Sequence, residues 1–156
     1  MLRAPSGSDA GMTLLELIIA CAILLILSSA ALPIAKYTVV RQKESELRRD
    51  LREMKDAIDR YKDAADRNQI RVEIGSEGYP PDLETLVKGV QLGASSDKKI
   101  RFLRKIPVDP MTGRAEWGLR AIQDDPDSTS WGGKNVFDVY SKSGGTALDG
   151  TKYSDW

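Results

Sequence analysis

The side chains in this sequence that could do chemistry are almost all carboxylates. Glu16 stands at the start of a long apolar run, and Asp124, Asp125 and Asp127 cluster in a loop-like stretch. The chain has no histidine, and its single cysteine, Cys21, lies inside the apolar run. It therefore lacks the commonest general base, the commonest zinc ligand and any thiol–histidine pair. We expect no enzymatic activity, because a carboxylate enzyme would need two acids that converge in one pocket.

Charge and cysteine content narrow the class of protein further. Lysine and arginine together number 23, as do aspartate and glutamate, so the formal net charge is zero. A neutral chain has no long-range attraction to nucleic acid, and we predict no nucleic-acid partner. One cysteine cannot form an intrachain disulfide. A small domain without a disulfide often needs another cross-link, such as a metal ion.

The apolar run, Leu17 to Ala35, contains no charged residue. As a helix it would rise about 28 Å, close to the thickness of the hydrocarbon core of a bilayer. A removable secretory signal and a plain single-span anchor are alternative interpretations, but neither explains Glu16. A carboxylate at the bilayer centre costs roughly 2.5–3.5 kcal/mol, and less near the interface. A cation at the same depth would compensate this cost, and a free amino terminus just before the helix could provide it.

The stretch GMTLLEL, Gly11 to Leu17, resembles the cleavage motif of type IV pilins and type II secretion pseudopilins. The resemblance implies a leader peptide over residues 1–11 that a prepilin peptidase removes by cutting between Gly11 and Met12. It also implies N-methylation of the new amino terminus at Met12. Glu16 then occupies the fifth mature position, and Pro33 stands where the family has a helix-bending proline.

The resemblance also implies a role for Glu16 in assembly. Its carboxylate would form a salt bridge with the terminal ammonium of Met12 on a neighbouring subunit during filament growth. Opposite charges at short range attract far more strongly in an apolar filament core than in water, although desolvation opposes part of the gain. The pair would therefore select the axial register of the subunits.

We expect one helix from near Met12 to about Arg67, with a kink at Pro33 because proline removes a backbone hydrogen bond. Residues 12–35 would form the transmembrane and polymerisation helix, and residues 36–67 its amphipathic continuation. A stripe of apolar side chains recurs there at steps of three and four, which predicts a buried face. Packing against a sheet of the same chain is favoured over a coiled-coil dimer, and most charges should form a solvated face. The stripe comprises Val40, Leu47, Leu51, Met54, Ile58, Tyr61 and Ala65.

Residues 68–156 predict a small C-terminal α+β domain. The stretch GYPPDLETLVKG indicates a turn and a short helix, with Asp82 and Glu84 at the positive helix start and Gly89 at its end. Strands are predicted at AEWGLR and at NVFDVYS, and the tail should be loop or a short final strand. The fold class is thus type IV pilin-like, with a long N-terminal helix packed on a small antiparallel β-sheet and a short second helix.

Four C-terminal pieces resemble the major pseudopilin of type II secretion systems, the G-type subunit. They are the helix around LETLV, the turn IPVDP, the strand FDVYS and the end LDGTKYSDW. In that family a calcium ion fastens the C-terminal loop. The resemblance nominates Asp149 and Asp155, with Ser143, as calcium ligands here. Ser143-Gly144-Gly145 stands where family loops usually have an aspartate, so the loop has one carboxylate fewer. Without calcium, Asp149-Gly150 would simply be a turn.

These features together predict a structural subunit that polymerises into a short periplasmic pseudopilus. The resemblance implies a single-pass protein of the bacterial inner membrane with its C-terminal domain in the periplasm. Implied partners are other copies of the chain, prepilin peptidase, a platform membrane protein, an assembly ATPase, minor pseudopilins, the secretin and the exported proteins. The alternatives are a type IV pilin of an adhesion or motility fibre, and a membrane-tethered binding module that never polymerises.

Overall fold

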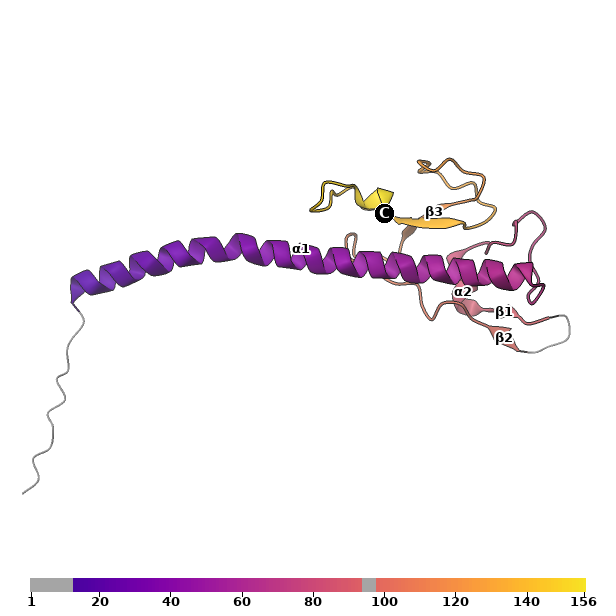
Figure 1. Ribbon diagram of the computed structural model, residues 1–156, viewed down its shortest axis with the longest axis horizontal. Helices are drawn as coiled ribbons and strands as arrows, with labels where there is room; N and C mark the ends of the chain where they lie inside the picture. The colour runs from indigo at the N-terminus through magenta and orange to yellow at the C-terminus, as the bar shows by residue number, and fades with distance from the viewer. Residues whose placement is uncertain (1–12, 94–97) are drawn as a thin grey trace, which may run out of the picture. The chain divides into compact units, whose positions relative to one another are not determined.

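The computed structural model describes residues 13–93 and 98–156, and it describes the backbone but not the side chains of residues 30–35. The chain divides into two compact units, residues 1–39 and residues 40–156. One helix, α1 (Leu14–Asp66), begins in the first unit and ends in the second. All other helices and strands of the described residues lie in the second unit (Figure 1).

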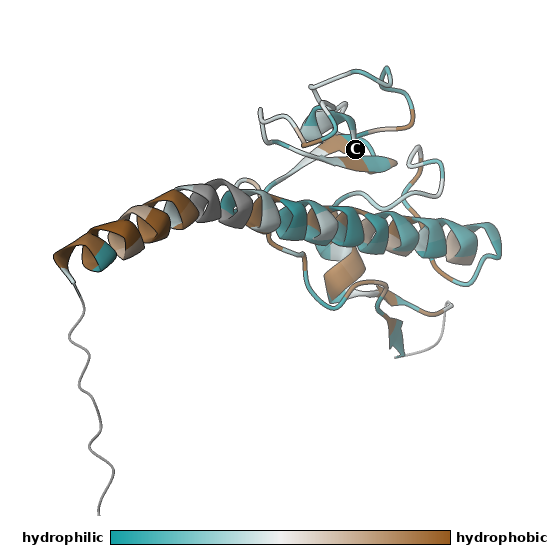
Figure 2. Cartoon of the chain, turned by 60° about the vertical axis from the view of Figure 1, so that its left-hand side comes forward, coloured by the Kyte–Doolittle hydropathy of each residue, from teal (hydrophilic) through white to brown (hydrophobic). Residues whose placement is uncertain are grey.

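The bounds of α1 confirm the predicted long helix. Neither glycine nor proline interrupts the sequence between Ile34 and Asp66, so every residue there can continue the backbone hydrogen bonds. The helix ends at Asp66, and two residues later Asn68 has a φ of 55°, a left-handed conformation that asparagine is one of the few residues to tolerate. The amides of Asn68 and Gln69 then donate back to the carbonyls of Ala65 and Ala64, at 2.9 Å each. Figure 2 shows the change along α1 from a hydrophobic first part to a largely hydrophilic second part.

The apolar stripe of α1 forms the central part of the core in the second unit. Leu47, Met54 and Ile58 are almost completely buried. Within this unit, α2 (Leu83–Lys88), β1 (Val90–Gln91) and β2 (Lys99–Ile100) lie on one side of α1, whereas β3 (Trp117–Arg120) and the C-terminal segment lie on another side (Figures 1 and 2). Because residues of the same chain cover the stripe, the intrachain packing is confirmed and no coiled-coil partner is needed to bury it. The other core positions on α1 are Leu51, Ala57, Tyr61, Ala64 and Ala65.

The short helix α2 (Leu83–Lys88) also confirms its prediction. The Asp82 carboxylate accepts the amide of Thr85 at 2.6 Å and the Thr85 hydroxyl at 2.7 Å, which caps the amino end. Gly89 ends the helix with a φ of 79°, and a Cβ at this position would lie 2.6 Å from the carbonyl oxygen of Ile100. Leu83 and Leu86 are buried and dock α2 in the core.

The described strands form two separate two-stranded antiparallel sheets. β3 (Trp117–Arg120) pairs with β4 (Asp138–Ser141), so both predicted strands are present in shortened form. β1 (Val90–Gln91) pairs with β2 (Lys99–Ile100), a pairing that sequence reasoning missed. Strands of two residues cannot show an alternating pattern, which explains why they escaped notice. The α+β class and the type IV pilin-like arrangement are nevertheless those predicted.

The tail is a loop that ends in a single 3₁₀ turn, η1 (Tyr153–Asp155). An isolated bridge between Thr146 and Lys152 closes the loop before the turn. Tyr153 is buried, and its ring meets that of Trp156 edge-on at 5.2 Å between centroids. The predicted final strand is therefore reduced to one bridge.

The charged face of α1 is less uniformly solvated than predicted. Asp50 is buried, with Arg49 at 3.4 Å from its carboxylate. Lys55 forms an ion pair with Asp138 of β4 at 3.0 Å, and Arg60 donates to the carbonyl of Phe102 at 2.7 Å. Such contacts depend on which strand or loop packs beside the helix, and helical periodicity does not contain that information.

Candidate functional site: the amino-terminal motif and the apolar helix segment

The predicted cleavage and methylation positions, Gly11 and Met12, lie outside the described residues. The predicted pairing of Glu16 with the ammonium of Met12 therefore stays a prediction. The described chain begins at Thr13, immediately before α1. Within the motif, the structure describes the local geometry around Thr13 and Glu16.

Thr13 caps the amino end of α1. Its hydroxyl oxygen accepts the backbone N–H of Glu16 at 3.2 Å, and its carbonyl accepts the N–H of Leu17 at 3.1 Å. A threonine followed three residues later by glutamate is the sequence pattern of a capping box, in which two side chains serve the free amides of the first turn. Sequence reasoning missed this local role, although the spacing of Thr13 and Glu16 was a readable signal.

Glu16 lies in the first turn of α1, where its side chain is exposed. The amino end of a helix carries a partial positive charge that favours a nearby carboxylate by about 0.3–1 kcal/mol. Among the described residues, no cation forms an ion pair with Glu16. The helix end therefore stabilises the Glu16 carboxylate. Because this carboxylate is exposed, it is accessible to a positive group of another molecule.

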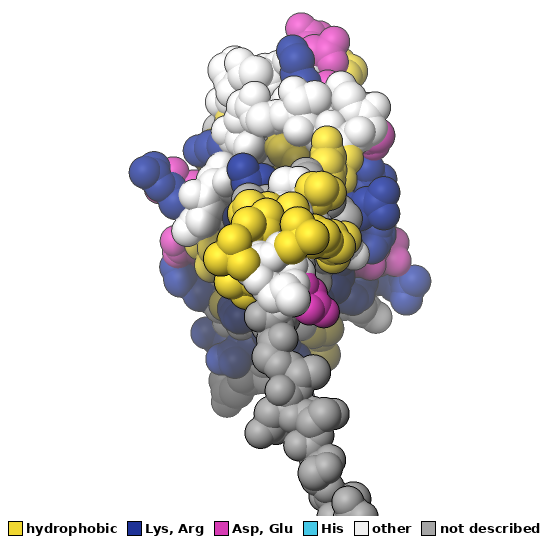
Figure 3. Space-filling model, turned by 90° about the vertical axis from the view of Figure 1, so that its left-hand side faces the viewer, with side chains coloured by type: hydrophobic (Ala, Val, Ile, Leu, Met, Phe, Trp, Pro, Cys, Tyr) yellow, Lys and Arg dark blue, Asp and Glu magenta, His cyan; other side chains and the backbone are white. Residues whose placement is uncertain are grey.

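Large apolar side chains surround the first part of α1, and those described between Leu14 and Leu27 are exposed. Leu14 is 77% exposed, Leu25 is 72% and Ile26 is 70%. Figure 3 shows hydrophobic side chains gathered at this end of the helix. Full burial of one such side chain contributes about 1.5–3 kcal/mol, so this segment gains stability wherever it is covered. The other exposed members are Leu15, Leu17, Ile18, Ile19, Ile23, Leu24 and Leu27.

Two further features of this segment bear on its behaviour in an apolar environment. The hydroxyl of Ser29 donates to the carbonyl of Ile26 at 2.8 Å, so this polar group is satisfied within the helix. Pro33 lies within α1, but its side chain is outside the description, and the predicted kink stays a prediction. Over the residues that the structure describes, no helix is both long enough and apolar enough to cross a membrane.

The residues predicted to hold calcium have hydrogen-bond partners within the chain, and calcium binding itself stays a prediction. Within residues 13–93 and 98–156, no three acidic, histidine or cysteine side chains converge as metal ligands. The carboxylate of Asp149 receives donors from Arg48 and Thr151, and that of Asp155 receives the hydroxyl of Ser154 at 3.0 Å. Ser143 accepts the amide of Gly145 at 3.3 Å. Calcium needs six to eight oxygen ligands, and an arginine beside the principal carboxylate opposes a divalent cation.

The acidic cluster Asp124–Asp127 has the geometry of an ordinary loop. The carboxylate of Asp124 accepts the amide of Ala121 at 2.7 Å and that of Gly132 at 3.0 Å. These bonds tie the two ends of the loop together. Asp125 and Asp127 are exposed. The Asp124 side chain therefore serves the local backbone.

The family comparison found a match in the amino-terminal segment of the chain. Residues 7–32 match the family model of the prokaryotic N-terminal methylation motif. The match covers Gly11, Met12 and Glu16, together with most of the apolar run. Comparisons with curated proteins and with solved structures found no match.

The methylation motif supports a subunit of the type IV pilin-like class, which includes pseudopilins. This class is structural rather than enzymatic. The motif implies processing by a prepilin peptidase and pilus-like assembly, and it suggests membrane anchoring. The α+β fold with its long amino-terminal helix is consistent with the same class.

Proposed function

We propose that this chain is the precursor of a major pseudopilin, which polymerises into a short periplasmic fibre that drives export by a type II secretion system. The observation that carries the proposal is the methylation motif joined directly to a helix segment whose described large apolar side chains, from Leu14 to Leu27, are exposed. A monomer in water would gain nothing from such a segment. A subunit that rests in the inner membrane and then packs into a fibre covers it in both states.

Assembly gives each part of the motif a physical task. Removal of residues 1–11 creates a new ammonium at Met12, and Glu16 of a neighbouring copy is the matching carboxylate. The capped helix start holds Glu16 at the rim of the apolar segment, with Thr13 bound to its backbone. An unpaired carboxylate would be costly in the fibre core, so correct axial register is favoured over other registers.

The secretion role is supported by the C-terminal sequence rather than by the motif, which pilins share. Residues 79–87, 106–110, 137–141 and 148–156 resemble the corresponding pieces of major pseudopilins. Many pilins close their C-terminal loop with a disulfide, and this chain, with one cysteine, cannot form one. Platform protein, assembly ATPase, minor pseudopilins, secretin and exported proteins are the partners that this role requires.

Processing is tested by the intact mass and the amino-terminal peptide of the protein isolated from membranes. We expect a mature chain that begins at N-methylated Met12, and an unprocessed chain from the Gly11→Ala variant, because the peptidase requires a residue without a side chain there. A wild-type chain that still begins at Met1 would contradict the proposal.

The secretion role is tested separately by deletion of the gene in its host. We expect exported enzymes to accumulate in the periplasm while surface fibres and twitching motility stay unchanged. Loss of surface fibres with normal export would instead identify a type IV pilin. A processed chain that forms no fibres would identify a tethered binding module.

A further inference from the structure

The C-terminal loop makes backbone hydrogen bonds within itself as well as side-chain contacts with α1. The amide of Ala147 donates to the carbonyl of Thr151 at 2.8 Å, and the amide of Gly150 donates to that of Ala147 at 3.0 Å. Gly150 has a φ of 88°, which side-chain-bearing residues rarely adopt. The backbone therefore sets the shape of the loop, and side chains are left to attach it to the helix.

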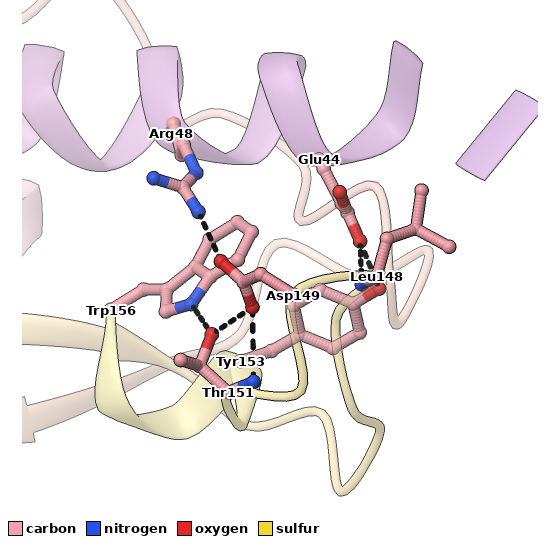
Figure 4. Close-up of polar contacts among 7 residues, drawn as sticks. All are labelled: Glu44, Arg48, Leu148, Asp149, Thr151, Tyr153 and Trp156. Carbon is pink, nitrogen blue, oxygen red and sulfur yellow. Dashed lines mark hydrogen bonds and ion pairs between the residues drawn. The ribbon is translucent and has the colours of Figure 1, made fainter. Parts of the chain in front are cut away.

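The first attachment is the half-buried carboxylate of Glu44 on α1. The same oxygen, Oε1, accepts the amide of Leu148 at 2.8 Å and the hydroxyl of Tyr153 at 3.1 Å (Figure 4). Burial raises the pKa of the Tyr153 hydroxyl, and its bond to Glu44 raises that pKa further. The tyrosine is thus held neutral and remains a donor. One glutamate fixes both the turn and the final 3₁₀ segment of the loop.

The second attachment lies one helical turn further on, at Arg48. Its guanidinium donates to Oδ2 of Asp149 at 3.2 Å and lies 3.9 Å from the centre of the Trp156 ring (Figure 4). Arginine can engage a carboxylate with its edge and an aromatic face with its plane at the same time. The guanidinium of Arg48 therefore contacts both ends of the segment Asp149–Trp156.

Thr151 links the two parts of this second attachment. Oδ1 of Asp149 accepts the Thr151 amide at 2.9 Å and the Thr151 hydroxyl at 2.6 Å. The indole N–H of Trp156 donates to the same hydroxyl oxygen at 2.7 Å. The bonds from Thr151, followed by the charge of Arg48, lower the pKa of Asp149. Both oxygens of Asp149 are thus occupied by donors from the chain itself.

A divalent cation would have to displace this arrangement. It would need Asp149 as its principal ligand, yet the oxygen nearest α1 is bound by a permanent positive charge. The second predicted carboxylate, Asp155, bonds to its neighbour Ser154 rather than turning toward Asp149. The guanidinium of Arg48 already occupies the place beside the Asp149 carboxylate to which a metal cation would be attracted.

We propose that the C-terminal loop of this chain is fastened to α1 without a metal ion, by Glu44 and by the cation–carboxylate–indole arrangement of Arg48, Asp149 and Trp156. Arginine supplies the positive charge that calcium supplies in similar loops. The attachment is independent of chelators. It is sensitive to salt, because the Arg48–Asp149 pair is half-exposed and ions screen it.

The first experiment compares thermal unfolding of the full-length protein in EDTA and in millimolar CaCl₂, at equal ionic strength. A ligand that binds only the folded state raises the melting temperature. We expect the same melting temperature in both solutions, and no heat of binding when CaCl₂ is titrated into the protein. A rise in calcium, or a fall in EDTA, would overturn the proposal.

The second experiment measures the Arg48→Ala variant against a matched control, Arg67→Ala. Arg67 directly follows α1 and forms an exposed ion pair with Asp63 of that helix, but this pair holds no loop. We expect Arg48→Ala to lower the melting temperature by roughly 3–6 °C and the control to change it by less than about 1 °C. The difference between wild type and Arg48→Ala should shrink in high salt. Equal effects of the two variants would overturn the proposal.

A conservative variant covers the case in which Arg48→Ala does not fold. Arg48→Lys keeps the charge but loses the planar group that reaches the carboxylate and the indole together. We expect a fall in melting temperature of a few degrees, together with reduced protection of the Leu148 and Thr151 amides in hydrogen exchange. Wild-type stability and protection in this variant would contradict the proposed geometry.

Discussion

At the residue scale, Asp109 shows how one buried carboxylate connects distant parts of the domain. It is completely buried, and Oδ2 accepts the hydroxyl of Ser141 in β4 at 2.6 Å. Oδ1 accepts the amide of Met111 at 2.7 Å, which holds the turn that follows. We predict that Asp109→Ala lowers the free energy of unfolding by about 2–4 kcal/mol, because these donors would be left buried without a partner. Urea unfolding measures the change, with the exposed Asp125→Ala as control, and a loss no larger than that of the control would contradict this role.

Asp50 is a residue whose burial works against stability at neutral pH. Burial is the main cause of its raised pKa, and the nearby Arg49 opposes this only in part. Glu46, Glu53 and Lys105 line the same surface cavity. Between the ordinary pKa of an aspartate and the raised value, the folded protein binds more protons than the unfolded protein. Stability therefore falls as pH rises through this window.

We predict that Asp50→Asn raises the melting temperature at pH 7 by about 1–3 °C, because the amide needs no charge to be buried. At about pH 3, below the ordinary pKa, the wild-type carboxyl is protonated in both states and the advantage should vanish. Thermal unfolding of both proteins at the two pH values measures this difference. A variant that is less stable than wild type at pH 7 would show that the bond to Arg49 dominates instead.

At the element scale, the β3–β4 pair depends on a glycine beneath an aromatic ring. Gly118 stands directly opposite Tyr140, and a Cβ on Gly118 would lie 2.2 Å from the tyrosine ring. The ring has little freedom to move, because Arg120 lies 4.2 Å from its centre and its hydroxyl donates to the carbonyl of Thr129 at 3.2 Å. We predict that Gly118→Ala destabilises the domain by about 1–3 kcal/mol through overpacking.

Gly144→Ala is the matched control for this prediction. A Cβ there would meet no atom within 4 Å, and its φ lies outside the left-handed region, so alanine should be tolerated. Denaturant unfolding of both variants measures the difference. Equal stability of Gly118→Ala and Gly144→Ala would mean that the Tyr140 ring can move away from residue 118 without loss of stability.

The elements also show what the sequence could predict. The long helix, its buried stripe, the Asp82 cap of α2 and the cores of β3 and β4 follow from periodicity, caps and β-branched or aromatic residues. The β1–β2 pair could not be predicted, since two residues carry no pattern. The burial of Asp50 and the partners of Arg48 could not be predicted either. Arg48 and Asp149 lie 101 positions apart in the sequence, and the loop or strand that packs beside each helix residue depends on the folded structure.

The candidate site divides in the same way. The methylation motif and Glu16 were recognisable from seven consecutive residues, and the matching family model confirms the motif. The resemblance to major pseudopilins predicts calcium ligands in the C-terminal loop, but it does not tell which side chains α1 brings to that loop. Arg48 belongs to the face of α1 that is predicted to be solvated, and only the fold places it beside Asp149.

At the scale of the whole molecule, the exposed apolar segment predicts the behaviour of Glu16 variants. We predict that Glu16→Ala is processed and inserted normally but is incorporated into fibres at least tenfold less than wild type, because Met12 loses its partner on the neighbouring copy. Sheared-fibre yield relative to membrane-bound protein measures this. Glu16→Gln is the matched variant, since it keeps size and polarity without the charge, and it should share the defect. Normal fibres from both variants would exclude the pairing.

The separation of the attached residues along the chain has a consequence for the order of folding. Glu44 and Arg48 meet residues 148–156 across separations of 101 to 109 positions. Closing such a long loop costs more entropy than closing local turns, so these contacts form late. During synthesis, Glu44 and Arg48 are made about a hundred residues before their partners in the C-terminal loop. Until residues 148–156 are made, the part of α1 around Glu44 and Arg48 lacks the loop that contacts it in the folded protein. We expect the nascent chain to be most sensitive to proteolysis, and to premature association with another copy, during this interval.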